Sequence, residues 1–285
     1  MRLLLVLIIL SAGACNARDQ SVVEKVESLG LQSVNSSVTA YYSDRYRQFA
    51  EHNVQLLKNA DDFFEEQFGV RQSFSIAVLD SASWRQITDI PYGLPFVSGP
   101  PYIVCLPANA QNTLSETISE AIDGYDLEGR YGTSREEIVG RFVSLIGFHE
   151  LGHMYARAYG IRFPNKWTFE FAATYLAYYY LDQNFPAERD LWLEVSRVLA
   201  RELAPRYTTL QEFEQWYVGV GVANYAWYQV AFLLQVQEVY EKSAKAFIRA
   251  MRDYPWPVNS ASDYLPEMDS ISPGFVAWAE KYQLQ

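Results

Sequence analysis

Five consecutive residues form the motif with the clearest chemical meaning in this chain. They read His149-Glu150-Leu151-Gly152-His153. On a helix, side chains four residues apart share one face, so both imidazoles can bind a single metal ion, and the spacing favours zinc. Glu150 would lie beside the ion, where its carboxylate can take a proton from water. Chance is a weak explanation, because the chain has only 3 histidines and two of them lie here.

A catalytic zinc ion needs a third protein ligand and one open position. No histidine follows His153, so this ligand is either a carboxylate or His52 from the N-terminal part. Glu170 is the best candidate, because it is a single charge in an apolar segment with a Phe on each side. Burying an unpaired carboxylate is costly, and zinc would offset that cost directly. The alternative for Glu170 is an ion pair on an exposed face, for example with Lys166.

Helical periodicity surrounds these candidate ligands. Apolar residues recur at helical spacing from Ile138 to the second histidine, after the capping residues Thr133 and Ser134, and Gly160 ends the run. The pattern predicts further helices over residues 166–181 and 187–203, from residue 208 onward, over 223–251 with a break near residue 242, and over 273–282. The C-terminal part is therefore expected to be all-helical.

The first part of the chain has a mixed pattern. It predicts strands over residues 38–42 and 73–79, a helix over 44–68, and a short strand over 102–106. Prolines on both sides place the last strand at the edge of a sheet. Residues 108–132 have no clear pattern. The predicted fold class is α+β, with a small mixed α/β N-terminal part that has an edge strand, followed by the helical part.

Composition limits the class of partner. The 285 residues are 49% hydrophobic and 20% charged, which predicts a folded protein with a large core. Their formal net charge is -11. A field of this sign repels polyanions, so a nucleic-acid partner is not expected.

The first fifteen residues predict export. An apolar block over residues 3–10 precedes small residues and Cys15, and the block is too short to span a bilayer. We expect a signal peptide over residues 1–14 and a lipidated Cys15, as in a bacterial cell-envelope lipoprotein anchored to the membrane by that lipid. Ordinary cleavage at Ala12-Gly13-Ala14, giving a periplasmic or secreted protein, is the alternative. Cys15 could then pair with Cys105, which is otherwise a buried free thiol.

The domain organisation follows from these assignments. Residues 15–35 are polar and mixed, and are expected to form a tether behind the processing site. Residues 36–285 are expected to form one catalytic domain, with an α/β lobe over 36–132 and a helical lobe over 133–285.

Around the candidate ligands the chain resembles the gluzincin metallopeptidases, the zincin group that includes thermolysin and the zinc aminopeptidases. Sixteen residues separate the His-Glu-x-x-His motif from Glu170. The aminopeptidases have the segment W-x-N-E-G-F-A-T-Y there, and this chain matches it at Trp167, Glu170, Ala173, Thr174 and Tyr175. The resemblance implies a zincin-like fold with one zinc ion.

The resemblance also implies a role for each matching residue. His149, His153 and Glu170 would be the zinc ligands, and Glu150 would be the general base. A weaker match is Tyr228-Gln229-Val230-Ala231, where the aminopeptidases have Y-x-K-G with an oxyanion-stabilising Tyr. Tyr228 is therefore the predicted second catalytic residue, and Tyr225 is its rival.

Some family features are missing. The G-A-M-E-N motif that holds a substrate's free amine has no counterpart, so aminopeptidase specificity is not implied. Thr174 replaces the Asp of thermolysin four residues after the Glu ligand, Phe169 replaces an Asn, and no additional histidine follows His153. The sequence therefore identifies no partner that orients the imidazoles. The predicted edge strand over residues 102–106 is the expected binding site for an extended substrate.

Together these features predict an exported zinc metallopeptidase that hydrolyses a peptide or protein substrate. A zincin-fold protein that binds a peptide or an envelope partner without turnover is the first alternative. A purely structural zinc is the second, although closed structural sites usually use Cys and a fourth protein ligand. The sequence indicates no oligomeric state.

Overall fold

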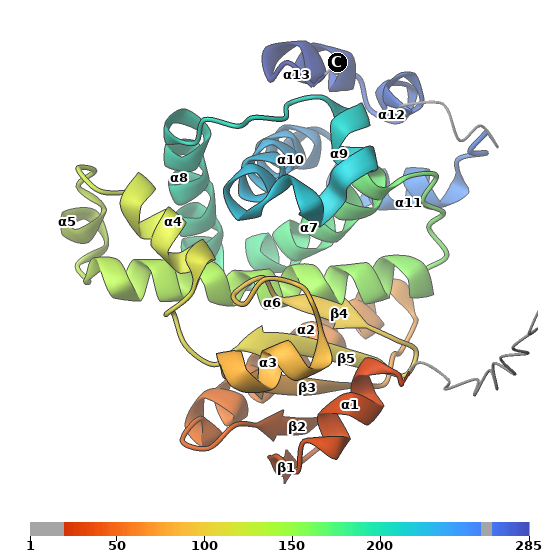
Figure 1. Cartoon of the computed structure of the whole chain (residues 1–285). Coiled ribbons are helices and arrows are strands. Elements are labelled where there is room, and N and C mark those ends of the chain that lie inside the picture. Colours follow the sequence, from red (N-terminus) through yellow and green to blue (C-terminus); the bar gives the residue numbers. More distant parts are fainter. Residues whose placement is uncertain (1–19, 258–263, 285) are drawn as a thin grey trace, which may run out of the picture.

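The computed structural model describes residues 20–257 and 264–284, and it has a small five-stranded sheet followed by a mostly helical part (Figure 1). This arrangement confirms the predicted α+β class. The predicted signal peptide and Cys15 lie outside the described residues. Within the described ranges, none of the helices is both long and apolar enough to cross a membrane.

The sheet has the strand order β1-β2-β3-β5-β4. Its strands are β1 (Gln32–Asn35), β2 (Thr39–Tyr42), β3 (Phe74–Leu79), β4 (Phe96–Ser98) and β5 (Tyr102–Pro107). The three inner strands are parallel, and both outer strands pair antiparallel with their neighbours. The edge position predicted for residues 102–106 is therefore wrong, because β4 covers β5. The flanking prolines lie at the strand's ends, where they interrupt none of its pairing.

Both faces of the sheet are covered by helices. On β3, Ile76 and Val78 pack on the main core with α2 (Arg47–Phe68), whereas Ala77 and Leu79 pack on a second cluster with α1 (Val22–Ser28) and α3 (Ser81–Ile87). This alternation is the period-two pattern of a strand. Val26 of α1 is fully buried in the second cluster. The tether expected over residues 15–35 therefore does not include α1 or β1, which belong to the folded body.

The remaining elements are helical. The first are α4 (Thr113–Ala121), α5 (Leu127–Tyr131), α6 (Arg135–Ala158), α7 (Lys166–Asn184), α8 (Pro186–Glu202) and α9 (Leu210–Trp216). The 3₁₀ turn η1 (Tyr217–Val220) leads to α10 (Val222–Ser243), α11 (Lys245–Asp253), α12 (Leu265–Ile271) and α13 (Phe275–Lys281). The predicted helices agree with α6 to α11 and α13, and the predicted break falls at Ala244. The sequence pattern missed α12 and left α4 and α5 unassigned.

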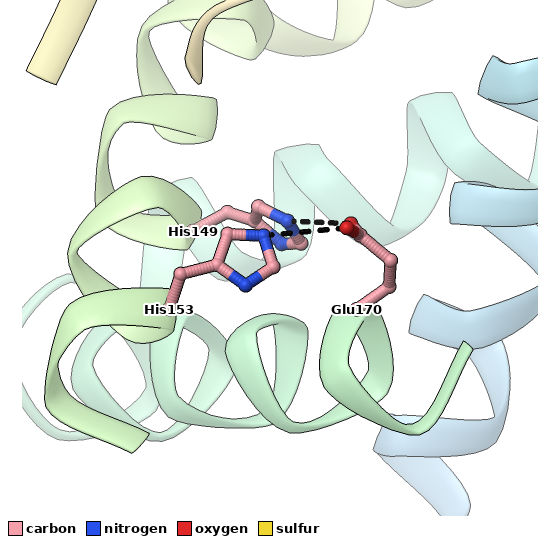
Figure 2. Close-up of side chains that lie close together, drawn as sticks. All are labelled: His149, His153 and Glu170. Atoms are coloured by element: carbon pink, nitrogen blue, oxygen red, sulfur yellow. Dashed lines mark hydrogen bonds and ion pairs between the residues drawn. The ribbon is translucent and has the colours of Figure 1, made fainter. Parts of the chain in front are cut away.

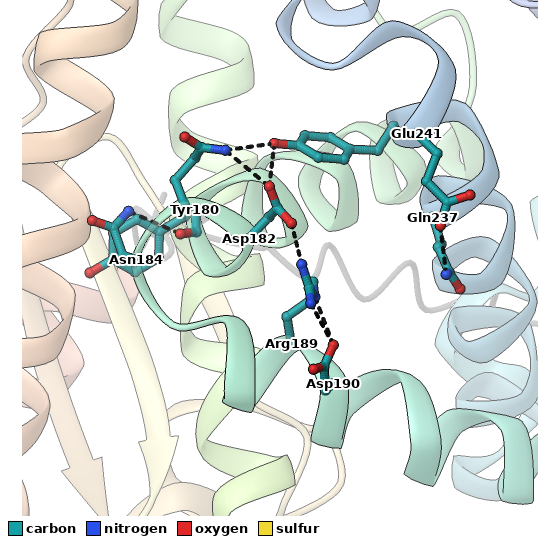
Figure 3. Close-up of polar contacts among 9 residues, drawn as sticks. Tyr180, Asp182, Asn184, Arg189, Asp190, Gln237 and Glu241 are labelled. Atoms are coloured by element: carbon teal, nitrogen blue, oxygen red, sulfur yellow. Dashed lines mark hydrogen bonds and ion pairs between the residues drawn. The ribbon is translucent and has the colours of Figure 1, made fainter.

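A polar network ties three of these helices together away from the sheet (Figure 3). Asp182 of α7 accepts hydrogen bonds from Arg189 of α8 and from the Tyr240 hydroxyl of α10, the latter at 2.9 Å. Gln183 donates to the same hydroxyl at 3.2 Å. The contacts of Tyr240 join residues more than fifty positions apart, and together the network fixes α8 and α10 relative to α7.

Helix α6 lies between the sheet and the other C-terminal helices (Figure 1), and its closest contact is with α7. At this contact Gly152 faces the backbone of Ala173. A Cβ atom on Gly152 would overlap the Ala173 carbonyl oxygen and lie 3.0 Å from its carbonyl carbon. The glycine is required here for close approach of two backbones, and this approach brings residues 149–153 next to Glu170.

Replacing Gly152 with Ala should therefore destabilise the fold by about 1–3 kcal/mol, as overpacking does elsewhere. Gly140→Ala is the matched control, because it lies on the same helix with no atom within 4 Å of the added methyl. That variant should stabilise by up to about 1 kcal/mol through helix propensity. Urea unfolding measures both. Equal changes in the free energy of unfolding would contradict the close contact.

Candidate metal centre

Three of the predicted ligands converge in the structure (Figure 2). The Nε2 atom of His149 lies 3.1 Å from Oε2 of Glu170, and the Nε2 atom of His153 lies 3.5 Å from Oε1. One potential ligand atom from each residue lies within 4.8 Å of the others. This His-His-Glu group could hold a metal ion. His52, the alternative third ligand, is exposed on α2 and is not part of the group.

Burial gives the group its electrostatic character. Glu170 is 1% exposed, and the two imidazoles are nearly as buried. Burial lowers the pKa of His153 to about 4, so this imidazole is neutral at pH 7 and can offer a lone pair. Burial alone would raise the pKa of Glu170, but its interactions with His153 and His149 bring that pKa well below the ordinary value. The site therefore combines two imidazoles with one carboxylate.

Thr174 orients the first imidazole. Its hydroxyl oxygen lies 3.1 Å from Nδ1 of His149, on the ring edge away from Glu170. With Nδ1 donating to Thr174, the lone pair of the ring is on Nε2, which is the atom that faces the carboxylate. The sequence analysis found no such partner. Thr174, which replaces the Asp of thermolysin, is the partner that orients His149.

Glu150 lies beside the group and takes no part in it. Burial and the nearby charge of Glu170 raise its pKa well above the ordinary value, and the backbone amide of Val97 opposes this shift. Val97 belongs to β4, which packs against α6. The edge strand β4 and Glu150 therefore lie next to each other, and the raised pKa favours the protonated form of this carboxyl group.

Three side chains outside the motif donate hydrogen bonds to Glu170. Gln229 and the Tyr225 hydroxyl, both from α10, donate to Oε2 at 2.7 and 3.1 Å. The Tyr217 hydroxyl donates to Oε1. Burial, followed by the charge of Glu170, raises the pKa of both tyrosines, so both phenols are neutral donors. These residues surround the carboxylate on the side away from α6.

The structure corrects the prediction for Tyr228. This side chain is fully buried, and its hydroxyl donates to the Thr209 carbonyl oxygen at 2.8 Å, not to the site. Tyr225, the rival residue, lies three residues earlier on the same helix, and its hydroxyl donates to Glu170. The Y-x-K-G match therefore lies on a helix that reaches Glu170, through Tyr225 and not through Tyr228.

Sequence reasoning missed Tyr217 altogether. It lies at the end of α9 with a φ of 50°, a left-handed conformation that is uncommon for residues other than Gly. Such conformations persist where the surrounding structure enforces them, and they are frequent at functional sites. No motif distinguishes this residue among 21 tyrosines. Only the folded chain brings it to Glu170.

An apolar cavity opens next to His149 and Glu150. It lies among α4, α6, α8 and α10, and its volume is about 80 Å³, several times the space that one buried water needs. Apolar side chains line most of it, including Leu114, Ile118, Phe142, Trp192, Val230 and Leu233. The cavity therefore suits an apolar side chain placed beside Glu150.

The second cysteine is not part of the His-His-Glu group. Cys105 is a free, fully buried thiol on β5, packed in the cluster beneath α1 and α3. Burial raises its pKa far above the ordinary value, so it is neither a reactive thiolate nor a ligand here.

Comparison with known proteins indicates no family for this chain. No protein-family model matches the chain, and no curated protein sequence matches it.

Replacing Thr174 with Val should weaken binding of a divalent metal ion about 10- to 100-fold, because the hydrogen bond that orients His149 is lost without a change in side-chain size. Titration with Co²⁺, followed by its visible absorption, measures this affinity. Thr39→Val on β2 is the matched control, since that hydroxyl bonds Asn35 far from the site. Equal Co²⁺ affinity in both variants would contradict the role of Thr174.

Proposed function

We propose that this protein is a zinc-dependent metallopeptidase with a gluzincin-type site on a zincin-like fold. The observation that carries the proposal is the position of Glu150, buried beside a His-His-Glu group without being part of it. A group that only binds a metal for structural reasons has no need of a second buried carboxylate. A hydrolase needs a base at this position.

The residues fit zinc in both chemistry and spacing. Ligands placed about 2.0–2.1 Å from zinc in a tetrahedron are about 3.3 Å apart. The separations between each His Nε2 and the Glu170 oxygens, 3.1 and 3.5 Å, fall on either side of that value. Two imidazoles with one carboxylate form one of the ligand sets found in catalytic zinc sites, with the fourth position open. The three ligands are therefore His149, His153 and Glu170.

In the proposed reaction the zinc ion and Glu150 have different roles. Zinc at this site would act as a Lewis acid that activates water and polarises the substrate carbonyl. Glu150 would accept the proton from the attacking water and pass it to the amine that leaves, so the proton balance closes on one residue. Its raised pKa strengthens it as a base for the first step, because burial and the charge of Glu170 favour the protonated carboxyl group.

Two phenols would stabilise the developing negative charge. Tyr217 and Tyr225 both reach the metal ligand Glu170, and both are neutral donors in a site from which water is largely excluded. With Glu170 bound to zinc, each hydroxyl would turn from the carboxylate to the developing oxyanion, where such donors contribute strongly to catalysis. In this proposal Tyr217 and Tyr225 take the oxyanion-stabilising role that the sequence predicted for Tyr228.

The proposed substrate is a peptide laid along β4. This strand pairs with β5 on one side only, and its Val97 amide is next to Glu150. An extended peptide added at such an edge would place its backbone beside the base. The adjacent apolar cavity would take one of its side chains. We therefore propose cleavage next to a bulky apolar residue.

The location of the enzyme is part of the proposal and rests on the sequence of residues 1–15. An export signal that ends at Cys15 supports a lipid-anchored protein of the bacterial cell envelope. Peptides or proteins outside the cytoplasm would then be its substrates.

Glu150→Gln should lower peptide hydrolysis about 10²- to 10⁴-fold, because the general base is lost while the three ligands remain. Mass spectrometry of a diverse peptide mixture, incubated with the wild type and with this variant, measures it. We expect cleavage by the wild type next to bulky apolar residues, and one zinc ion per chain in both proteins. Equal cleavage by both proteins would refute the role of Glu150. If neither protein cuts any peptide although each holds zinc, the alternative of a peptide-binding protein without turnover is favoured.

Tyr217→Phe and Tyr225→Phe should each lower kcat about 10²-fold, with zinc content unchanged, because each removes one donor to the oxyanion. Tyr228→Phe is the matched control and should keep kcat within about twofold, since its hydroxyl bonds Thr209. Steady-state kinetics on one peptide from the mixture decides the question. A large loss in the Tyr228 variant alone would restore the sequence-based assignment.

A further inference from the structure

The two imidazoles of the metal centre are held in different ways. His149 has Thr174 on its Nδ1 atom, whereas the buried Nδ1 of His153 has no hydrogen-bond partner within the described part of the chain. Because this edge of the ring has no partner, no hydrogen bond there orients the imidazole. Leaving a buried N–H unpaired also costs about 1–3 kcal/mol. Packing must hold it in the position where Nε2 faces Glu170.

Phe169 provides the closest packing. Its ring centroid lies 4.0 Å from that of His153, with the two planes inclined by 34°. Phe163 contacts the same phenyl ring edge-on, with centroids 4.9 Å apart. Phe169 directly precedes the ligand Glu170 on α7, so the residue that packs on one ligand is covalently adjacent to another.

Arg157 completes the arrangement from α6. Its guanidinium carbon lies 4.4 Å from the centroid of the Phe169 ring, within the range of a cation–π contact. Arg157 follows His153 by four residues, so both side chains lie on one face of the helix. None of the ion pairs found in residues 20–257 and 264–284 includes Arg157. Its guanidinium is therefore placed against the phenyl ring without a carboxylate partner among these residues.

We infer that Phe169, supported by Arg157, is a positioning residue that orients His153 as a metal ligand by ring stacking. This inference rests on the proposed zinc site and extends it. A hydrogen bond orients His149, and an aromatic contact orients His153. The residues that make these contacts, Thr174 and Phe169, both lie on α7 within four positions of Glu170. Arg157 contacts Phe169, and its charge also acts directly on His153.

The test is zinc affinity in the absence of substrate, measured on the mature chain by competition with a chelator. Phe169→Leu keeps an apolar side chain and removes the ring, and should raise the Kd for zinc about threefold to tenfold, the range expected of an aromatic contact. Phe169→Tyr keeps the ring and should stay within about twofold of the wild type. Arg157→Gln, at an exposed site where folding is not at risk, should raise the Kd about twofold to fourfold.

Phe185→Leu is the matched control. Phe185 is also half-buried, and its ring packs against that of Tyr180, with centroids 5.8 Å apart, and not against a candidate ligand. Thermal unfolding of the metal-free proteins separates positioning from stability. We expect similar midpoints for Phe169→Leu and Phe185→Leu, and a raised Kd only for Phe169→Leu. Equal zinc affinity in these two variants would overturn the inference while leaving the zinc site intact. A wild type that binds no zinc would overturn the zinc site and this inference with it.

Discussion

The close approach of α6 and α7 at Gly152 and Ala173 is the contact on which the site depends. Glu170 reaches both imidazoles only because the two backbones touch where any larger residue would force them apart. The same contact brings Thr174 to His149 and Phe169 to His153. The helix pair therefore supplies the three candidate ligands and the groups that orient two of them. The sheet beneath α6 and the helices above α7 hold the pair in place.

Burial at this contact has an electrostatic consequence. A carboxylate that is 1% exposed would be strongly destabilised alone, and the chain surrounds it with two imidazoles, two phenols and an amide. Glu150 lies just outside this set and has a raised pKa. The two glutamates thus have opposite pKa shifts within one site. Pairs of titratable groups separated in this way are typical of acid–base catalysis.

Local sequence patterns predicted the parts of the structure that depend on local chemistry. The His-Glu-x-x-His helix, the isolated Glu170 and most helix boundaries follow from periodicity and capping, and the structure agrees with them. The errors concern long-range pairing. Strand order placed β4, not β5, at the sheet edge, and a left-handed turn brought Tyr217 to the site in place of Tyr228. Neither outcome has a local signal, because each depends on where distant segments meet.

The central claim is that the buried group is a catalytic zinc centre with one position open to water. Crystals of the purified protein, with anomalous diffraction recorded on both sides of the zinc absorption edge, test it most directly. The account predicts one zinc peak per chain, bound to the Nε2 atoms of His149 and His153, to the Glu170 carboxylate and to one solvent molecule near Glu150. A peak closed by a fourth protein ligand, or none at this group in zinc-replete crystals, would contradict it.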